Sequence, residues 1–161
     1  MAPNSQTIRI RPMEVSDFQF IRRLASTQFQ FTCPPHYILW MLTRTNSRNC
    51  IVAEDAKYGP VAYLLSLPVS TSRERTLYIW QLAASARGRR NGAIHLLLLA
   101  LRKFVRRMRI RFLVFSAVPD SPEFRAIRRQ ARTIFGTVRD SRHILPPGVS
   151  RNEHEFVIRV R

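Results

Sequence analysis

Two glutamates near the end of the chain are the carboxylates best suited to acid–base chemistry. Glu153 and Glu155 are one residue apart in a chain with only ten acidic residues. In an extended segment, residues two apart point to the same face, so the two carboxylates would lie together. One could bind an ammonium group while the other accepts its proton. The alternative is that both are solvated or pair with nearby arginines such as Arg151 and Arg159.

A second candidate site is a stretch that predicts a strand, a turn and a helix. Thr76–Ala84 predicts a buried strand, and an apolar helix is expected from about Ala93. The amide groups at a helix N-terminus have no partner within the helix, and the helix dipole adds positive potential there. Arg87, Arg89 and Arg90 add charge to the turn between them. We therefore expect this turn to face the phosphates of a cofactor.

The composition fits one globular domain over residues 1–161, because 45% of the residues are hydrophobic and the chain is long enough to bury a core. The net charge is +17, and Lys57 and Lys103 are the only lysines, so 25 of the 27 basic residues are arginines. Such a charge predicts affinity for polyanions. Genome base composition explains the arginine usage equally well.

Two further basic runs lie on expected helices or just after them. No nucleic-acid motif or set of interleaved aromatic residues accompanies them, so solvated helix faces are favoured over nucleic-acid binding. The residues of the two runs are Arg102, Lys103, Arg106, Arg107, Arg109 and Arg111, and Arg125, Arg128, Arg129 and Arg132.

The remaining residue patterns argue against metal and membrane functions. Cys33 and Cys50 form no ligand spacing with each other or with the four histidines, so no metal is expected. The longest apolar run, Ile94–Leu101, is far too short for a membrane span. We expect a soluble, cytoplasmic protein with reduced cysteines.

The elements that would position these residues follow from periodicity and turn signals. Their order predicts a mixed sheet whose faces are covered by helices. Ser16 and Gln19 have capping-box spacing, and Lys57–Pro60 predicts a hairpin turn. The expected strands are Thr7–Met13, Asn49–Glu54, Val61–Leu67, Thr76–Ala84, Phe112–Val118, Thr137–His143 and Phe156–Val160. The expected helices are Asp17–Thr27, one opened by Pro34 and Pro35, Ala93–Arg107, and one from Asp120 or Ser121 to near Gly136. The expected loops are Pro68–Arg75 and Leu145–Asn152.

This order and three motifs resemble the GNAT superfamily of acetyl-CoA-dependent N-acetyltransferases, and within it the diaminobutyrate acetyltransferases of ectoine synthesis. The motifs are the run Trp80-Gln81-Leu82-Ala83, the turn Ala86–Gly92, and the final strand Glu155–Val160. The resemblance implies an α/β (α+β) fold with a mixed, mostly antiparallel central sheet and helices on both faces. It also implies acetyl transfer to a small amine, with 2,4-diaminobutyrate as the implied substrate. Family members are often dimers, so a homodimer is among the implied partners.

The resemblance also assigns candidate site residues. It implies catalytic roles for Glu155 and Glu153, the alternative being that both are solvated or pair with arginines. It places Trp80, Tyr37 and Thr32 at the substrate, although a tryptophan in a central strand is otherwise a core residue. Acetyl-CoA would contact Leu82, Ala84, Arg87, Gly88, Arg89, Arg90, Asn91, Gly92 and Ser121.

The turn departs from the family pattern in ways that keep a second function open. Arg90 occupies the position of the first signature glycine, where a side chain should crowd the close backbone approach. Asn91 replaces an apolar residue, and the turn is about two residues shorter than in the diaminobutyrate enzymes. The arginines could compensate by contacting phosphate. Alternatively, the turn is degenerate and the protein binds an anionic partner such as nucleic acid.

Overall fold

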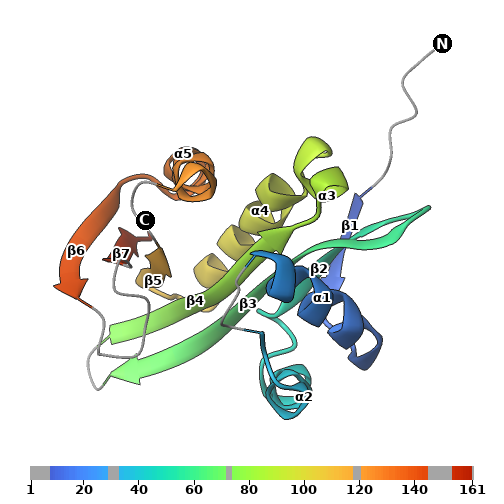
Figure 1. The fold of residues 1–161 in the computed structure, drawn as a ribbon. Coiled ribbons are helices and arrows are strands. Elements are labelled where there is room, and N and C mark those ends of the chain that lie inside the picture. The colour runs from blue at the N-terminus through green and yellow to red at the C-terminus, as the bar shows by residue number, and fades with distance from the viewer. Residues whose placement is uncertain (1–7, 29–32, 72–73, 118–120, 145–153, 161) are drawn as a thin grey trace. The chain divides into compact units, whose positions relative to one another are not determined.

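The computed structural model describes residues 8–28, 33–71, 74–117, 121–144 and 154–160 (Figure 1). Seven strands form one sheet in the order β1-β2-β3-β4-β5-β7-β6. The β4–β5 pair is parallel, and the other described pairings are antiparallel. The mixed, mostly antiparallel sheet expected from the sequence is therefore confirmed. The strands are β1 (Ile8–Pro12), β2 (Ile51–Asp55), β3 (Gly59–Thr71), β4 (Glu74–Ala84), β5 (Phe112–Ala117), β6 (Val138–Ile144) and β7 (His154–Arg159).

The helices are the 3-10 turn η1 (Val15–Asp17), α1 (Phe18–Gln28), α2 (His36–Thr45), α3 (Ala86–Arg90), α4 (Ala93–Arg107) and α5 (Pro122–Phe135). The chain divides into two compact units. The first contains Met1–Leu65 and Gln81–Ala100, and the second contains Ser66–Trp80 and Leu101–Arg161. Strands β3 and β4 and helix α4 run from one unit into the other. The single domain expected over 1–161 stays a prediction.

In the first unit, the antiparallel strands β1, β2 and β3 are joined by the expected hairpin between β2 and β3. Helix α1 buries Phe18, Ile21 and Ala25, which recur at helical spacing and so form one apolar stripe. Helix α2 buries Leu39 and Leu42 in the same way. Helices α1 and α2 are drawn on one side of the strands, and α3 with the start of α4 on the other (Figure 1).

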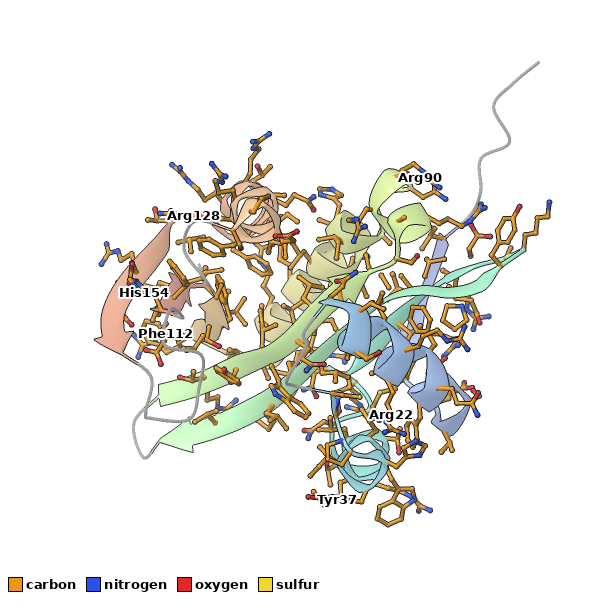
Figure 2. All side chains as sticks on the ribbon, in the orientation of Figure 1. Arg22, Tyr37, Arg90, Phe112, Arg128 and His154 are labelled. Atoms are coloured by element: carbon orange, nitrogen blue, oxygen red, sulfur yellow. The ribbon has the colours of Figure 1, made fainter. Side chains whose placement is uncertain are left out.

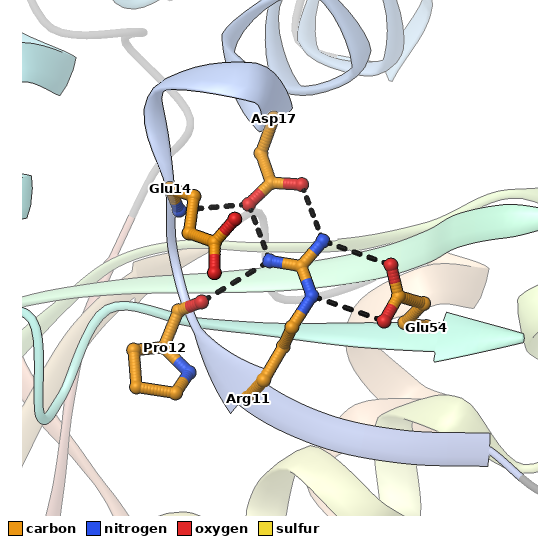
Figure 3. Close-up of polar contacts among 5 residues, drawn as sticks. All are labelled: Arg11, Pro12, Glu14, Asp17 and Glu54. Atoms are coloured by element: carbon orange, nitrogen blue, oxygen red, sulfur yellow. Dashed lines mark hydrogen bonds and ion pairs between the residues drawn. The ribbon is translucent and has the colours of Figure 1, made fainter.

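A charged cluster ties β1, η1 and β2 together in this unit (Figure 3). The Arg11 guanidinium donates to Asp17 at 2.7 and 2.8 Å and to Glu54 at 3.0 and 3.1 Å. Asp17 also accepts a bond from the Glu14 amide at 2.8 Å. These hydrogen bonds raise the pKa of Arg11, that to Asp17 contributing most, and the bond from Arg11 lowers the pKa of Glu54. The Asp17 side chain is 1% exposed, so these hydrogen bonds replace the contacts that its carboxylate would otherwise make with water.

In the second unit, three phenylalanines on three elements build the core under α5. Phe115 of β5 and Phe156 of β7 are direct partners across the strands and stack at 5.5 Å between ring centroids. Phe124 in the first turn of α5 packs on Phe156 at 4.3 Å. Ser121 caps α5 by accepting a bond from the Phe124 amide at 3.1 Å. The cap and the aromatic contact together fix where α5 begins.

Two expectations about local structure are wrong. Pro68–Arg75 is not a loop, because β3 continues to Thr71 and β4 begins at Glu74. Polar residues also occupy the exposed parts of strands, so the polar composition of this stretch does not distinguish a loop from a strand. Ser16 is not an N-cap, because it lies inside η1, whose N-cap is Glu14, and the Glu14 amide donates to the Asp17 carboxylate.

Candidate functional site

The turn after β4 is itself helical, which the sequence did not predict. Ser85 is the N-cap of α3, and its hydroxyl accepts a bond from the Gly88 amide at 3.2 Å. The same hydroxyl donates to the Val61 carbonyl at 3.0 Å, and the Ser85 amide donates to that carbonyl at 2.9 Å. One serine therefore joins β3 to the start of α3 and sets where the turn begins.

Gly88 is the residue at which the backbone comes closest to its surroundings. A Cβ at this position would lie within van der Waals distance of the Val61 carbonyl oxygen and carbon and of the Ala84 side chain. The contact with the carbonyl oxygen would be closer than real Cβ atoms allow, and its partner is backbone rather than a flexible side chain. The turn therefore requires glycine at position 88.

Arg90 fits the backbone of the turn without strain, and the crowding expected from its motif position stays a prediction. It lies at the last position of α3 with an exposed side chain that projects away from the helix (Figure 2). Its φ is not positive, whereas Gly92 has φ 72° and no atom within 4 Å of the place a Cβ would occupy. The left-handed step that reverses the chain direction before α4 thus falls on Gly92, which adopts it without strain.

The other two arginines of the turn have partners within their own unit. The Arg87 guanidinium stacks on the Tyr58 ring at 3.5 Å from the centroid, and Lys57 lies 5.1 Å from the same centroid. The Arg89 guanidinium donates to the Ala84 carbonyl at 2.9 Å. These contacts orient the turn. Arg89 is still exposed, and Arg90 is the arginine of the three for which the described residues supply no such contact.

The last residues of β4 are held by hydrogen bonds from two other elements, α1 and β3. The Ala84 carbonyl also accepts a bond from the Gln28 side chain of α1 at 2.8 Å. Gln81 accepts a bond from the Tyr63 hydroxyl at 3.0 Å in the interior. Burial raises the pKa of Tyr63, so its hydroxyl keeps its proton and acts as the donor. Leu82, between these anchors, is half-buried.

In the second unit, Trp80 and Glu155 belong to the same face of the sheet. Ser116 of β5 pairs directly with Glu155 of β7, and both lie opposite the face that carries Phe115 and Phe156. Ile79 of β4 pairs with Phe115, so Trp80, one residue further, points to the Ser116 side. Two strand spacings, about 10 Å, separate β4 from β7, and Ser116 lies between them.

The polar groups on this face are already ordered by hydrogen bonds. The Ser141 hydroxyl lies 3.1 Å from Glu155 Oε1 and 3.0 Å from the Glu155 carbonyl oxygen. Tyr78 and Ser116 are joined through their hydroxyls at 3.2 Å. His154 points the other way and pairs with Asp140 at 3.0 Å. A half-buried carboxylate held by a serine can bind a cation or accept a proton.

The remaining predicted residues are less informative or are not described. Tyr37 lies in the first turn of α2 with 66% of its side chain exposed (Figure 2). Ser121 uses its hydroxyl to cap α5. Asn91 is the C-cap of α3. Glu153 and Thr32 lie outside the described residues.

Several residues with a direct part in this geometry were missed from the sequence. Ser85 could have been found, because serine before a helical turn is a common cap. Tyr58, Ser116 and Ser141 could not, because each meets its partner across a hairpin or from a separate strand. Among the described residues, no three histidine, cysteine or acidic side chains are grouped to hold a metal. No helix in that part of the chain has the length and apolar character to span a membrane.

Comparisons with known proteins agree with this architecture. The family model described as "Acetyltransferase (GNAT) family" matches residues 15–129, whereas comparison with curated proteins finds no match. Ard1 from Thermoplasma volcanium superposes with a TM-score of 0.73 at 19% identity, over 96% of this chain and 98% of that one. Diaminobutyrate acetyltransferase EctA from Paenibacillus lautus, solved with L-2,4-diaminobutyric acid and coenzyme A, gives 0.73 at 19% identity over 96% of both chains.

A phosphinothricin acetyltransferase from Sinorhizobium meliloti, solved with acetyl-CoA, gives a TM-score of 0.66 at 15% identity over 96% of this chain and 89% of that one. At such identities the similarity shows the fold. The family match spans well over half of the chain and includes β4, α3 and α4. The chain therefore belongs to the acetyltransferase (GNAT) family.

Proposed function

We propose that this protein is an acetyl-CoA-dependent N-acetyltransferase that acts on a small amine. The observation that carries the proposal is the sheet face of the second unit that holds Trp80, Ser116 and Glu155. An aromatic ring and a carboxylate on one face suit an ammonium group, which is attracted to both. L-2,4-Diaminobutyrate is the amine we propose first, because the sequence resembles the enzymes that acetylate it.

Glu155 is proposed as the group that takes the proton from the amine. An amine is protonated near neutral pH and attacks a thioester carbonyl only after losing a proton. Glu155 takes the first proton from the ammonium group. The neutral nitrogen then bonds to the acetyl carbon as the carbon–sulfur bond breaks, coenzyme A leaves as the thiolate, and the second proton lost by the nitrogen ends on that sulfur. Ser141 lies at Oε1 of Glu155, which leaves Oε2 for the substrate. Glu153 is proposed to bind the second ammonium group of a diamine.

Acetyl-CoA is proposed to place its pyrophosphate at the turn between α3 and α4. The N-terminal amides of α4 and its dipole favour an anion, and the space beside Gly92 is open to one. Arg90 is proposed to contact a phosphate, because its side chain faces solvent. Arg90→Gly should weaken acetyl-CoA binding about tenfold, the loss expected for a charge-assisted hydrogen bond. Tighter binding of the variant would mean that Arg90 obstructs the site.

Turnover of acetyl-CoA against diamines, amino acids and aminoacyl compounds tests the proposal most directly. We expect activity with a diamine and a fall of at least 100-fold in kcat for Glu155→Gln, in the range of a lost general base. Glu123→Gln, an exposed carboxylate on α5, is the matched control and should retain wild-type kcat. An unchanged kcat in Glu155→Gln would remove the assigned role.

The second candidate is a GNAT-fold protein that no longer binds the cofactor and serves as a binding protein for an anionic partner. It is favoured by the internal partners of Arg87 and Arg89, which leave one arginine of the turn for phosphate. Calorimetric titration with acetyl-CoA separates the candidates. Absence of both binding heat and a thermal shift would favour this second function.

A further inference from the structure

Helix α5 carries a straight stripe of four arginines on its outer side. Arg125, Arg128, Arg129 and Arg132 follow the i, i+3, i+4, i+7 spacing of one helix face. The apolar residues Phe124, Ala131, Ile134 and Phe135 occupy the opposite, buried face. The stripe covers about 10 Å along the helix, given a rise of about 1.5 Å per residue.

The stripe is not neutralised by the surrounding residues that the structure describes. Within those residues, no carboxylate lies within 4.0 Å of any of the four guanidinium groups, although ion pairs form elsewhere. Four like charges on adjacent helical turns repel one another, so the arrangement destabilises the isolated helix. A ligand with several negative charges would relieve that repulsion.

The surface between these side chains is hollowed. Open hollows of about 370 and 470 Å³ lie along α5, the first lined by Pro122, Arg125, Ala126, Arg129 and Gln130, the second by Arg125, Arg128, Arg129, Arg132 and Thr133. Arg128, labelled in Figure 2, has its Nε shielded from solvent with no hydrogen-bond partner within the described part of the chain. That atom is closed to solvent and therefore to a ligand, whereas the exposed side chains of Arg125, Arg129 and Arg132 line the hollow and are the donors that an oxygen acceptor would meet there.

The composition of the stripe distinguishes among anionic partners. A helix that lies in a membrane surface inserts its apolar face, and the apolar face of α5 is buried in its own core, so only the charge of the stripe would attract lipid headgroups. An acidic protein requires apolar or aromatic anchors at the centre of the interface, and none of the large apolar side chains exposed in the described residues lies on α5. A nucleic-acid backbone requires neither, and arginine matches phosphate oxygens with two parallel donors.

We propose that the arginine stripe of α5, formed by Arg125, Arg128, Arg129 and Arg132, binds the phosphate backbone of double-stranded nucleic acid. A length of about 10 Å faces about three phosphates of one strand, given one phosphate per about 3.4 Å. No exposed aromatic ring lies on α5 to stack with an unpaired base, so the surface fits a duplex without sequence preference. This activity is separate from acetyl transfer and does not depend on it.

Fluorescence anisotropy with a labelled duplex of arbitrary sequence, over a series of salt concentrations, tests the proposal. Each phosphate contact contributes about −0.9 to the slope of log K against log salt. Replacing all four arginines by glutamine should therefore reduce the magnitude of the slope by about 3. A matched control replaces four exposed arginines of the first unit, Arg9, Arg22, Arg23 and Arg48, by glutamine. This control changes net charge equally and should retain most of the wild-type slope.

Single replacements guard against misfolding of the quadruple variant, and each one that removes a phosphate contact should reduce the magnitude of the slope by about 0.9, with the four losses together amounting to about 3. Lysine at all four positions should retain duplex binding with a similar slope, because the charges remain. Equal losses in the stripe variant and the control would overturn the proposal and assign binding to net charge alone. Failure of the wild-type protein to bind duplex near physiological salt, with or without binding to anionic vesicles or an acidic peptide, would overturn it as well.

Discussion

The space around each backbone position decides which residues of the turn after β4 can change. Arg90 is accommodated because it ends a short helix and its side chain faces solvent. Gly88, only two residues earlier, faces the Val61 carbonyl and has no room for a Cβ. The family motif predicts a glycine at position 90. The packing shows instead that position 88 is where only glycine fits.

Gly88→Ala should therefore destabilise the protein by about 1–3 kcal/mol, the usual cost of forcing an extra methyl group into packed surroundings. The gain in helix propensity from alanine, at most about 1 kcal/mol, offsets part of this cost. Arg90→Ala in the same helix should change stability by less than about 0.5 kcal/mol, as for other exposed sites. Urea unfolding of both variants measures the difference. Equal stability of the two would show that β3 and α3 move apart freely.

The cluster around Arg11 makes stability depend on acid pH through Glu54. The hydrogen bond from Arg11 lowers the pKa of Glu54 in the folded protein. The contribution of Glu54 to the free energy of unfolding is therefore complete above its pKa in the unfolded chain, about 4.3. It is lost as the pH falls through the lowered pKa of the folded protein. Free energies of unfolding measured from pH 7 to pH 3 should fall more steeply for the wild type than for Glu54→Gln. Parallel profiles would contradict this coupling.

At the scale of the element, the turn that follows α4 (Ala93–Arg107) contains a residue that is poorly suited to its conformation. Arg109 has φ 53°, a left-handed conformation that glycine adopts without strain. The Ile110 amide donates to the Val105 carbonyl at 2.9 Å across this step, which closes the helix end. The left-handed conformation of Arg109 thus results from the hydrogen bond that closes the helix end and not from a preference of arginine.

Arg109→Gly and Arg109→Ala remove the same charge, so their difference isolates the backbone strain. We expect the glycine variant to be more stable than the alanine variant by about 1 kcal/mol, because alanine keeps the steric cost of the left-handed region. Thermal unfolding of the two variants measures the difference. A more stable alanine variant would mean that the helix end rearranges.

Sequence reasoning predicted the elements best where one local signal dominates. The range Ala93–Arg107 agrees with α4, because an unbroken apolar stripe and flanking turn residues define that helix. Local signals failed for α3, which is held by the bonds of Ser85 to Val61 from another strand. They also failed at Pro68–Arg75, where pairing rather than composition determines how far β3 and β4 extend.

The same limit applies to the candidate site. Trp80 and Glu155 could be selected from their residue types and motifs, whereas their position on one face of the sheet required the register of the strands. Ser116 and Ser141 could not, because their relation to Glu155 depends on the register of β5, β6 and β7. Tyr58 meets Arg87 only because the β2–β3 hairpin reaches α3. Contacts between distant segments therefore account for most of what the sequence left open.

At the scale of the whole molecule, charge repulsion should make stability rise with salt. The chain carries 27 basic and 10 acidic side chains, and an excess of like charges on a folded protein destabilises the folded state. Salt shortens the screening length from about 30 Å at 0.01 M to about 3 Å at 1 M. Screening should weaken the buried Arg11 cluster far less than the repulsion between exposed arginines.

Scanning calorimetry in sodium chloride from about 0.02 M to 0.5 M should thus show an increase in Tm, of about 2–4 °C for each kcal/mol of repulsion that is screened. The variant with glutamine at all four stripe positions of α5 has fewer charges to screen, so its Tm should rise less over the same range. It should also start from a higher Tm at low salt, because four neighbouring positive charges have been removed. A Tm that falls with salt in the wild type would mean that attractive ion pairs outweigh the excess positive charge.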